Sequence, residues 1–509
     1  MYRFWTAFFL ASFVFSGAPK ISSRLSKDEQ ILHAANRLTF GATPQDIAAI
    51  RKVGVEKWVD QQLRPETIAE NPALTERLRA LDSLGLSNAE LIQKYPPPQL
   101  IRNKKKEDGE ANAETMAARQ AVRKVYTDLA EAKVLRAVHS NRQLEELLTD
   151  FWFNHFNVFF DKGFDRVLVT SYERDAIRPH VLGNFRDLLL ATARHPAMLF
   201  YLDNWTSVST DGLPQVRRKA AAKQKRAAGL NENYARELLE LHTMGVDGGY
   251  TQKDVTEVAR CFTGWSIAEI REGGKFQFRP MLHDRKAKQV LGEVIQPGRG
   301  EEDGLEVIDI LVRHPATARF ISTKLAQRFV SDAPPETLIT KMAATFTKSR
   351  GDLRAVTRTM LTAPEFWAPE AYQAKMKMPL EMIASALRAT GAEVTTTAAL
   401  QQELRTMGQP LYRKVEPTGY TAMAEEWTNS AALLARMNFG IQLTQNKVRG
   451  VRVDLDGRLG GKRTAAAIAE ALLLRAPAAE TLAALETKAD ATPARVAGLV
   501  LGGPEFQRR

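Results

Sequence analysis

Cysteine is almost absent from this chain of 509 residues, which contains only Cys261. A single thiol cannot form an intramolecular disulfide, so a disulfide-stapled scaffold is excluded, as is a zinc site built from paired cysteines. A chain of this length can bury a core large enough to be stable without such cross-links. Cys261 precedes Phe262 in an apolar segment, and we expect a buried hydrophobic side chain there rather than a nucleophile.

The common catalytic motifs are missing as well. The sequence contains no His-Glu-x-x-His, no Gly-x-Ser-x-Gly, no P-loop and no dinucleotide-binding glycine pattern. These absences remove the direct sequence signals for zinc proteases, α/β-hydrolases, P-loop enzymes and Rossmann enzymes. Any site must therefore be assembled from segments that are distant in the sequence.

Apolar runs long enough to enter a membrane are absent beyond the N-terminus, since a spanning helix needs about 20 apolar residues. Residues 1–18 combine Arg3 with a shorter apolar stretch that ends in small residues, which predicts a secretory signal peptide. The alternative is an uncleaved membrane anchor, because Pro19 hinders cleavage at the end of this stretch. We therefore expect a periplasmic or extracellular protein with no membrane span beyond the N-terminal signal.

Positive charge is in excess, and the formal net charge is +12. Two clusters of Lys and Arg lie within residues 102–106 and 217–226. Neither is accompanied by a zinc-finger, helix-turn-helix or aromatic RNA-binding pattern, so we expect solvated insertions rather than a specific nucleic-acid interface. A basic loop can still contact an anionic polymer of the cell envelope or the extracellular space.

Apolar residues recur at helical spacing along nearly the whole chain, which predicts a mainly α protein with a large multi-helical body and few short strands. Thr43 followed by Pro44 predicts a capped helix over residues 44–63. Only residues 275–278 alternate like a strand, and we expect them to pair with residues 290–291 in a hairpin.

The organisation along the chain predicts two helical lobes. A segment rich in Gly and charge at residues 296–303 separates an N-terminal lobe with the polar motifs, residues 28–295, from a C-terminal lobe, residues 304–509. His195 and His314 each precede a proline, which biases them away from helical backbone and predicts that they start helices.

The segment 229–245 places polar groups in a sequence that otherwise has the spacing of a buried helix. Asn231 or Asn233 can cap the start of this helix, and Gly245 fits its end, so we expect a helix over residues 231–244.

One face of this helix carries charges of both signs. Glu232, Arg236 and Glu240 stand four residues apart, which predicts a partly buried structural network. Glu237 and His242 are five residues apart, so on an α-helix they point about 140° from each other and can share an ion only if the helix ends early.

Imidazoles and carboxylates are the groups that bind zinc, iron or manganese, and helical proteins assemble such sites from separate helices. The sequence therefore offers a site for one divalent transition metal with metal ligands His155, His283 and Asp284, and with catalytic groups Glu237, Glu240 and His242. The alternative is structural: an ionic ladder on the helix, a core histidine at 155 and a turn at 283–284.

Several blocks of the sequence carry a family resemblance. They are residues 37–44 (RLTFGATP), 151–156 (FWFNHF), 172–174 (YER), 229–245, 263–265 (TGW), 283–284 (HD) and 504–509 (PEFQRR). With these blocks the chain resembles the bacterial domain of unknown function 1800 family from about Ile31 to its last residue. The resemblance implies a mostly helical, frequently exported protein, and it implies no particular reaction.

Two functions fit these observations. The first is an exported protein with a metal-assisted site that hydrolyses or modifies an envelope or extracellular polymer. The alternative is a non-catalytic assembly or polymer-binding protein whose polar helix is an internal brace. A catalytic site should leave its carboxylates and histidines converging on an open cleft, whereas a brace should leave them paired and sealed.

Overall fold

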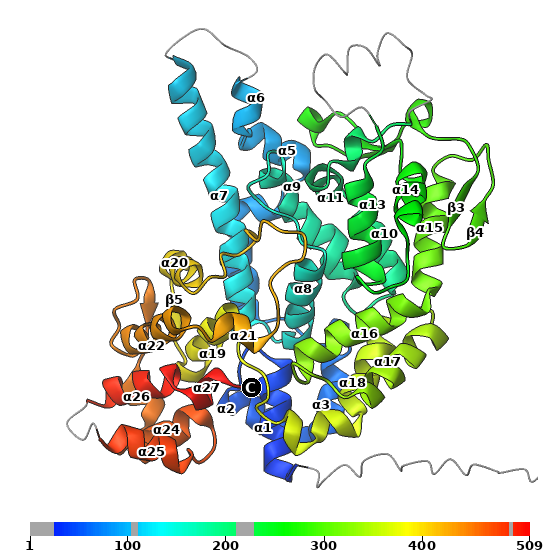
Figure 1. Cartoon of the computed structure of the whole chain (residues 1–509). Helices are drawn as coiled ribbons and strands as arrows, with labels where there is room; N and C mark the ends of the chain where they lie inside the picture. Colours follow the sequence, from blue (N-terminus) through cyan, green and yellow to red (C-terminus); the bar gives the residue numbers. More distant parts are fainter. Residues whose placement is uncertain (1–24, 103–109, 210–228, 488–491) are drawn as a thin grey trace, which may run out of the picture.

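The computed structural model describes residues 25–102, 110–209, 229–487 and 492–509, and it confirms the mainly α class. Helices supply most of the regular structure, and the described strands form two-stranded antiparallel sheets (Figure 1). The expected signal peptide lies outside the described residues, as do the second basic cluster and the lysines of the first. Within the described ranges, no helix is both long enough and apolar enough to cross a bilayer.

Capped helices begin the described chain. Ser26 and Thr43 each form a capping box, and they start α1 (Lys27–Leu38) and α2 (Pro44–Val53). Gly54, at φ +86°, ends α2 and starts α3 (Val55–Gln62). The helix expected over residues 44–63 is therefore two helices, because glycine adopts this left-handed backbone without a steric penalty.

The next elements are α4 (Pro72–Arg79), α5 (Asn88–Lys94), α6 (Pro98–Arg102), α9 (Asp165–Ser171), α10 (Phe185–Arg194), α11 (Pro196–Tyr201), α14 (Gln252–Cys261) and α15 (Glu302–Arg313).

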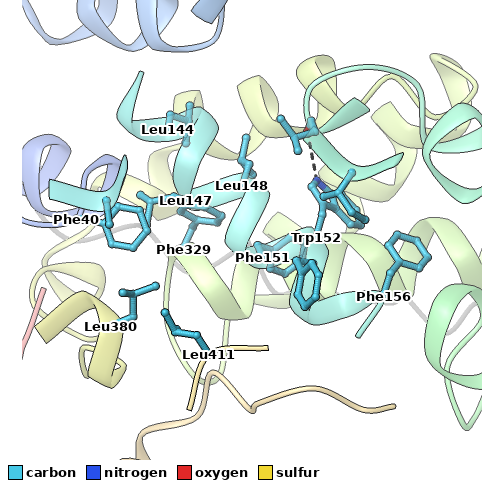
Figure 2. Close-up of a cluster of buried hydrophobic side chains, with 14 of the residues drawn as sticks. Phe40, Leu144, Leu147, Leu148, Phe151, Trp152, Phe156, Phe329, Leu380 and Leu411 are labelled. Atoms are coloured by element: carbon cyan, nitrogen blue, oxygen red, sulfur yellow. Dashed lines mark hydrogen bonds between the residues drawn. The ribbon is translucent and has the colours of Figure 1, made fainter. Parts of the chain in front are cut away.

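Four long helices contribute to the buried apolar cluster, and they are α7 (Glu110–His139), α8 (Gln143–His155), α16 (Pro315–Phe329) and α19 (Pro379–Thr390). Figure 2 shows part of the apolar cluster between them, to which α8 contributes Leu147 and Phe151 and other segments contribute Phe40, Phe329 and Leu380. One continuous cluster includes buried residues on both sides of 296–303. The division into two lobes at that segment stays a prediction.

Two histidines start helices in the same way. The Nδ1 atom of His195 accepts the backbone N–H of Ala197 at 3.1 Å, and that of His314 accepts the N–H of Ala316 at 3.2 Å. The prediction that these histidines start helices is confirmed, with the imidazole in the capping role that Ser, Thr, Asp or Asn usually fills.

Two helices change their winding near the centre of the molecule. α9 continues into the π-helix η3 (Tyr172–Ile177), and α13 (Glu232–Glu237) continues into the π-helix η6 (Leu238–Thr243). The side chain of Asn231 caps α13 and Gly245, at φ +81°, follows η6, so both predicted boundaries are confirmed. The uniform α-helix expected between them is wrong, because its second half has hydrogen bonds that join residues five apart.

The strands pair differently from the expected hairpin. β1 (Trp265–Ile267) pairs with β2 (Phe276–Phe278), and β3 (Lys288–Val290) pairs with β4 (Glu293–Ile295). Leu291 and Gly292 both have positive φ and turn the chain directly after Val290, as a two-residue hairpin loop requires. That turn takes β3 to its sequence neighbour, so the expected pairing of 275–278 with 290–291 is wrong.

The last part of the chain adds α17 (Glu336–Lys348), α18 (Leu353–Thr362), β5 (Glu393–Val394), α20 (Ala398–Thr406), α21 (Ala424–Trp427), α22 (Ser430–Thr444), β6 (Val451–Arg452), α23 (Leu455–Leu459), α24 (Ala465–Leu473), α25 (Ala479–Glu486), α26 (Pro493–Gly502) and α27 (Pro504–Gln507). α22 and α26 pack at close range: a Cβ atom placed on Gly498 would lie 2.6 Å from the Cα atom of Ile441.

Candidate functional site

His155 and His242 lie together in the interior. The Nε2 atom of His155 is 3.1 Å from the carbonyl oxygen of His242, and the two ring centroids are 6.4 Å apart. Since a carbonyl only accepts, His155 donates from Nε2. Burial, with the nearby positive charge of Lys324, lowers the pKa of His155 well below its ordinary value, and burial lowers the pKa of His242 to about 3. Both imidazoles are therefore neutral at physiological pH.

The π-turn changes the geometry of the helix that carries His242. The backbone N–H of Met244 donates to the carbonyl of Leu239 at 2.8 Å, five residues back. In a π-turn the hydrogen bonds join residues five apart, so side chains five residues apart diverge by less than the 140° expected on an α-helix. Glu237 nevertheless stays partly exposed while His242 is buried. Burial and the neighbouring charge of Glu240 raise the pKa of Glu237.

The polar face of α13 is joined through neighbouring side chains. Arg236 Nη2 donates to Gln252 Oε1 at 2.7 Å, and Gln252 Nε2 donates to Glu232 Oε2 at 2.8 Å. Glu240 accepts the hydroxyl of Tyr250 at 2.8 Å. The predicted network of Glu232 and Arg236 is thus bridged by an amide, and its members are only partly buried.

His283 and Asp284 belong to a different cluster. His283 Nε2 lies 3.1 Å from Asp303 Oδ2, which also accepts Lys288 Nζ at 2.6 Å. Arg260 donates to both carboxylate oxygens of Asp284, at 2.9 and 3.2 Å. Burial alone would raise the pKa of Asp284, but the hydrogen bonds from Arg260 and from the Lys286 N–H, together with the charges of Arg260 and Lys288, lower that pKa. These charged groups are paired with one another and lie between α14, the turn at residues 283–284 and α15.

The predicted metal ligands therefore have different neighbours. Among the described residues, His155 and His283 have no hydrogen-bond or ring-stacking partner in common. No group of three or more His, Cys, Asp or Glu side chains in the described part of the chain is arranged to hold a metal ion. The donor set for a metal is thus not assembled around His155, His283 and Asp284.

Two possible nucleophiles have structural surroundings. Cys261 is fully buried, and burial raises the pKa of its thiol well above the ordinary value. Ser171 Oγ lies 3.2 Å from His195 Nε2. Because Nδ1 of His195 accepts the N–H of Ala197, its proton is on Nε2, and the imidazole donates to Ser171 instead of accepting a proton from it. A serine nucleophile needs the opposite arrangement.

The interior contains a continuous chain of charged side chains, which we call the ionic chain. Its members in contact order are Glu146, Arg178, Glu173, Lys133, Asp150, Arg328, Glu381 and Arg509. Each side chain is at most 19% exposed, so these charged groups contact one another rather than water. It connects α7, α8 and η3 with α16, α19 and the last residues of the chain.

The sequence alone did not identify the ionic chain as a site. Glu173 and Arg509 stand in two of the family-like blocks, and Asp150 directly precedes a third. The available signal was a single charge inside an apolar helical stretch, as at Asp150, which precedes Phe151, Trp152 and Phe153. Such a charge is expensive to bury alone, so each one implies a partner, but the sequence does not say which.

A small cavity opens beside the ionic chain, and we call it the α8–α16 cavity. Its volume is about 70 Å³, and its polar walls are formed by Asp150, Asn154, His155, Lys324 and Arg328. The remaining lining is formed by Phe151, Gln327, Met378 and residues 420–423. This is the place where a predicted site residue, His155, adjoins both open space and charged groups.

A larger hollow lies on the surface beside α7, and we call it the arginine groove. It consists of two adjoining hollows of about 510 and 410 Å³ that share Arg123, Tyr126 and Arg413. The charged side chains that line it are Arg119, Arg123, Arg166, Arg405, Arg413 and Asp161. Among the described lining residues, five guanidinium groups thus face a single carboxylate.

The floor of the arginine groove is aromatic. The guanidinium of Arg413 lies 3.9 Å from the ring centroid of Tyr126, which meets the ring of Phe160 edge to face at 5.2 Å. Asp161 forms an ion pair with Arg413, whose Nε lies 2.8 Å from Oδ2, and its Oδ1 lies 3.5 Å from Arg166 Nε. Among the described residues, Arg119, Arg123 and Arg405 have no carboxylate partner.

Comparison with known proteins gives a family and no activity. A family model described as "Protein of unknown function (DUF1800)" matches residues 33–508, in agreement with the resemblance of the motif blocks. No curated protein and no solved structure gives a significant match to the chain.

Proposed function

The chain belongs to the DUF1800 family, whose description names no activity, and from this premise we propose that it is an exported protein that binds an anionic polymer of the cell envelope or the extracellular space. The observation that carries this proposal is the arginine groove, with five guanidinium groups and one carboxylate along two adjoining hollows. Two hollows that adjoin one another suit a chain-like ligand better than a compact one.

The chemistry of the arginine groove fits carboxylate, sulfate or phosphate groups. A guanidinium presents a planar fork of N–H donors that matches such groups bidentately and is less strongly hydrated than an ammonium. Tyr126 and Phe160 are almost fully buried beneath these groups, and the stacking of Arg413 on the Tyr126 ring holds that guanidinium in place. Arg119, Arg123 and Arg405 are exposed and have no carboxylate partner among the described residues, so their charge is available to an anionic ligand, although Arg405 Nη1 also donates to Gln402 Oε1 at 2.8 Å.

The histidines and carboxylates of the sequence-based site support binding rather than metal-assisted hydrolysis. His155 and His242 are buried and neutral, and His283 and Asp284 are paired with Asp303 and Arg260. This is the arrangement expected of a brace, because the polar groups hold helices together and do not converge on the large open hollow.

The test is a binding measurement on the full-length protein with sodium polygalacturonate as the anionic probe and dextran as the neutral one. We expect saturable binding of polygalacturonate that weakens as salt is added, since the contacts are electrostatic, and no binding of dextran. Arg123→Gln with Arg405→Gln should weaken binding by roughly tenfold or more, because each charge-assisted hydrogen bond contributes about 1 kcal/mol at such an exposed site.

The matched control removes two arginines elsewhere on the surface. Arg51 and Arg313 are 61% and 55% exposed and are paired with Asp28 and Glu293, so Arg51→Gln with Arg313→Gln makes the same change in net charge. Equal loss of binding in the control would show that overall charge, rather than the arginine groove, attracts the polymer. That result, or an absence of polygalacturonate binding, would contradict the proposal.

A further inference from the structure

The α8–α16 cavity is a second open space, separate in composition from the arginine groove. It lies between α8, α16 and residues 420–423, and its volume is about 70 Å³. A water molecule occupies roughly 15 Å³ of such space, so the cavity has room for about five of them. That is the size of a molecule with four or five non-hydrogen atoms, such as acetate or phosphate.

Two cationic groups line this cavity without a full set of partners. Lys324 has no hydrogen-bond or ion-pair partner among the described residues, and burial lowers its pKa. Arg328 is buried; its Nη1 atom donates to Glu381, while Nη2 lies 3.5 Å from Asp150 Oδ2 and forms no hydrogen bond. A buried cation whose N–H groups have no acceptor is unfavourable unless another group accepts hydrogen bonds from them.

The carboxylates nearby are already in use. Asp150 Oδ1 accepts Lys133 Nζ at 2.9 Å, and Glu381 Oε1 is shared by Arg328 and by Arg509 Nη2. Around the cavity, the four cations Lys133, Lys324, Arg328 and Arg509 outnumber the three carboxylates Asp150, Glu381 and Glu173, the last of which lies 3.6 Å from Lys133 Nζ. His155 is neutral and adds no charge. The local excess is positive, so a bound anion would be stabilised and a metal cation would be repelled.

The wall opposite the helices is held in a fixed position. Asn154 Nδ2 donates to the carbonyl of Tyr420 at 2.7 Å, and the Tyr420 N–H donates back to Asn154 Oδ1 at 2.7 Å. Gly419, at φ +69°, passes so close that a Cβ atom there would lie 2.2 Å from the carbonyl oxygen of Asn154. The cavity is thus preorganised and need not be assembled by its ligand.

We propose that the α8–α16 cavity is a binding site for a small oxyanion, either inorganic phosphate or the carboxylate of a small organic acid, held by Lys324 Nζ and Arg328 Nη2. Asp150 orients Arg328 through their ion pair, and Asp150 is itself held by a hydrogen bond from Lys133. The site is independent of the arginine groove, because the two share no lining residue.

The experiment is isothermal titration of the full-length protein, in separate runs, with phosphate, acetate and chloride at equal ionic strength. We expect saturable binding of one equivalent of phosphate or acetate, accompanied by a rise in melting temperature that chloride does not produce. Binding of phosphate alone would identify a phosphoryl ligand, and binding of acetate would identify a carboxylate ligand. If neither oxyanion binds more tightly than chloride, the proposal is wrong.

The variants separate the site from general electrostatics. Lys324→Gln removes no described contact, so it should fold and should lose at least tenfold in affinity, while Lys324→Arg should keep part of it. Lys348→Gln removes an equal charge from an exposed position of α17 and should bind like the parent. Unchanged affinity in Lys324→Gln would overturn the assignment. Binding that survives in the Arg123→Gln, Arg405→Gln variant would show that the α8–α16 cavity is separate from the arginine groove.

Discussion

At the scale of single residues, the molecule is organised by charges that meet in its interior. Glu381 accepts from Arg328 and Arg509, and Asp150 joins this group to Lys133. Replacing a complete buried ion pair by apolar groups can be nearly neutral, but removing one partner leaves an uncompensated charge in a medium of low polarity. The ionic chain is therefore sensitive to the loss of any single member.

We predict that Glu381→Gln destabilises the protein by about 3–5 kcal/mol, because Arg328 and Arg509 would lose the negative charge between them. Urea unfolding followed by circular dichroism measures this change. Glu336→Gln, which removes a 59% exposed carboxylate paired with Arg319, is the control and should change stability little. Equal stability of the two variants would contradict a buried ionic chain.

Glu381 also predicts an acid limb of stability. Burial alone would raise its pKa, but Arg328 and Arg509 lower it from 4.5 to about 2. A carboxyl whose folded pKa is depressed adds stability that is present above the unfolded pKa and is lost as pH falls from 4.5 towards 2. The difference in stability between the parent and Glu381→Gln should therefore shrink across this range of pH.

Arg236 illustrates the opposite case. It bonds to the amide of Gln252 and is only partly buried, so we predict that Arg236→Ala costs less than about 1 kcal/mol, as surface polar contacts usually do. A melting curve compares it with the parent. A loss near that of Glu381→Gln would show that this face of α13 is part of the brace.

At the scale of elements, the close approach of α22 and α26 leaves little freedom in how these two helices pack. Gly440 and Gly498 leave no room for a side chain, since a Cβ atom on Gly440 would lie 2.6 Å from the carbonyl oxygen of Gly498. Small residues at such a crossing let two helical backbones approach, and an added methyl group forces them apart.

Gly498→Ala should therefore destabilise the protein by about 1–3 kcal/mol through overpacking, although alanine is the better helix former. Gly85→Ala is the matched control, because nothing lies within 4 Å of a Cβ atom at that position. Thermal unfolding of the two variants gives the comparison. If Gly498→Ala is as stable as the parent, the two helices can separate without loss.

The sequence predicts helices better than it predicts contacts between them. The ends of the segment at 231–244 follow from Asn231 and Gly245, whose caps are local in sequence. The π-turn inside that segment and the pairing of β3 with β4 depend on packing and on the turn at Leu291, and periodicity does not encode them. Likewise, Asp150 is visible as an isolated charge before an aromatic run, while its pairing with Lys133 across α7 and α8 requires the fold.

At the scale of the whole molecule, the predicted destination is outside the cytoplasm. This prediction depends on residues 1–18, with a basic start and a short apolar stretch. Fusion of residues 1–30 to a reporter that is active only in the periplasm tests it, with a leaderless fusion as the control. A signal no higher than that of the control would contradict export and would remove an extracellular polymer as the ligand.

The burial of Arg37 at the end of α1 bears on how the chain reaches this fold. Arg37 Nη1 donates to the carbonyl of Phe329, 292 residues away, and Arg388 Nε donates to the carbonyl of Gly41, 347 residues away. Helical proteins usually fold fast because their contacts are local, and contacts of such long separation slow folding. We expect refolding to proceed through an intermediate in which most helices have formed, and the docking of α1 to be its slow final step.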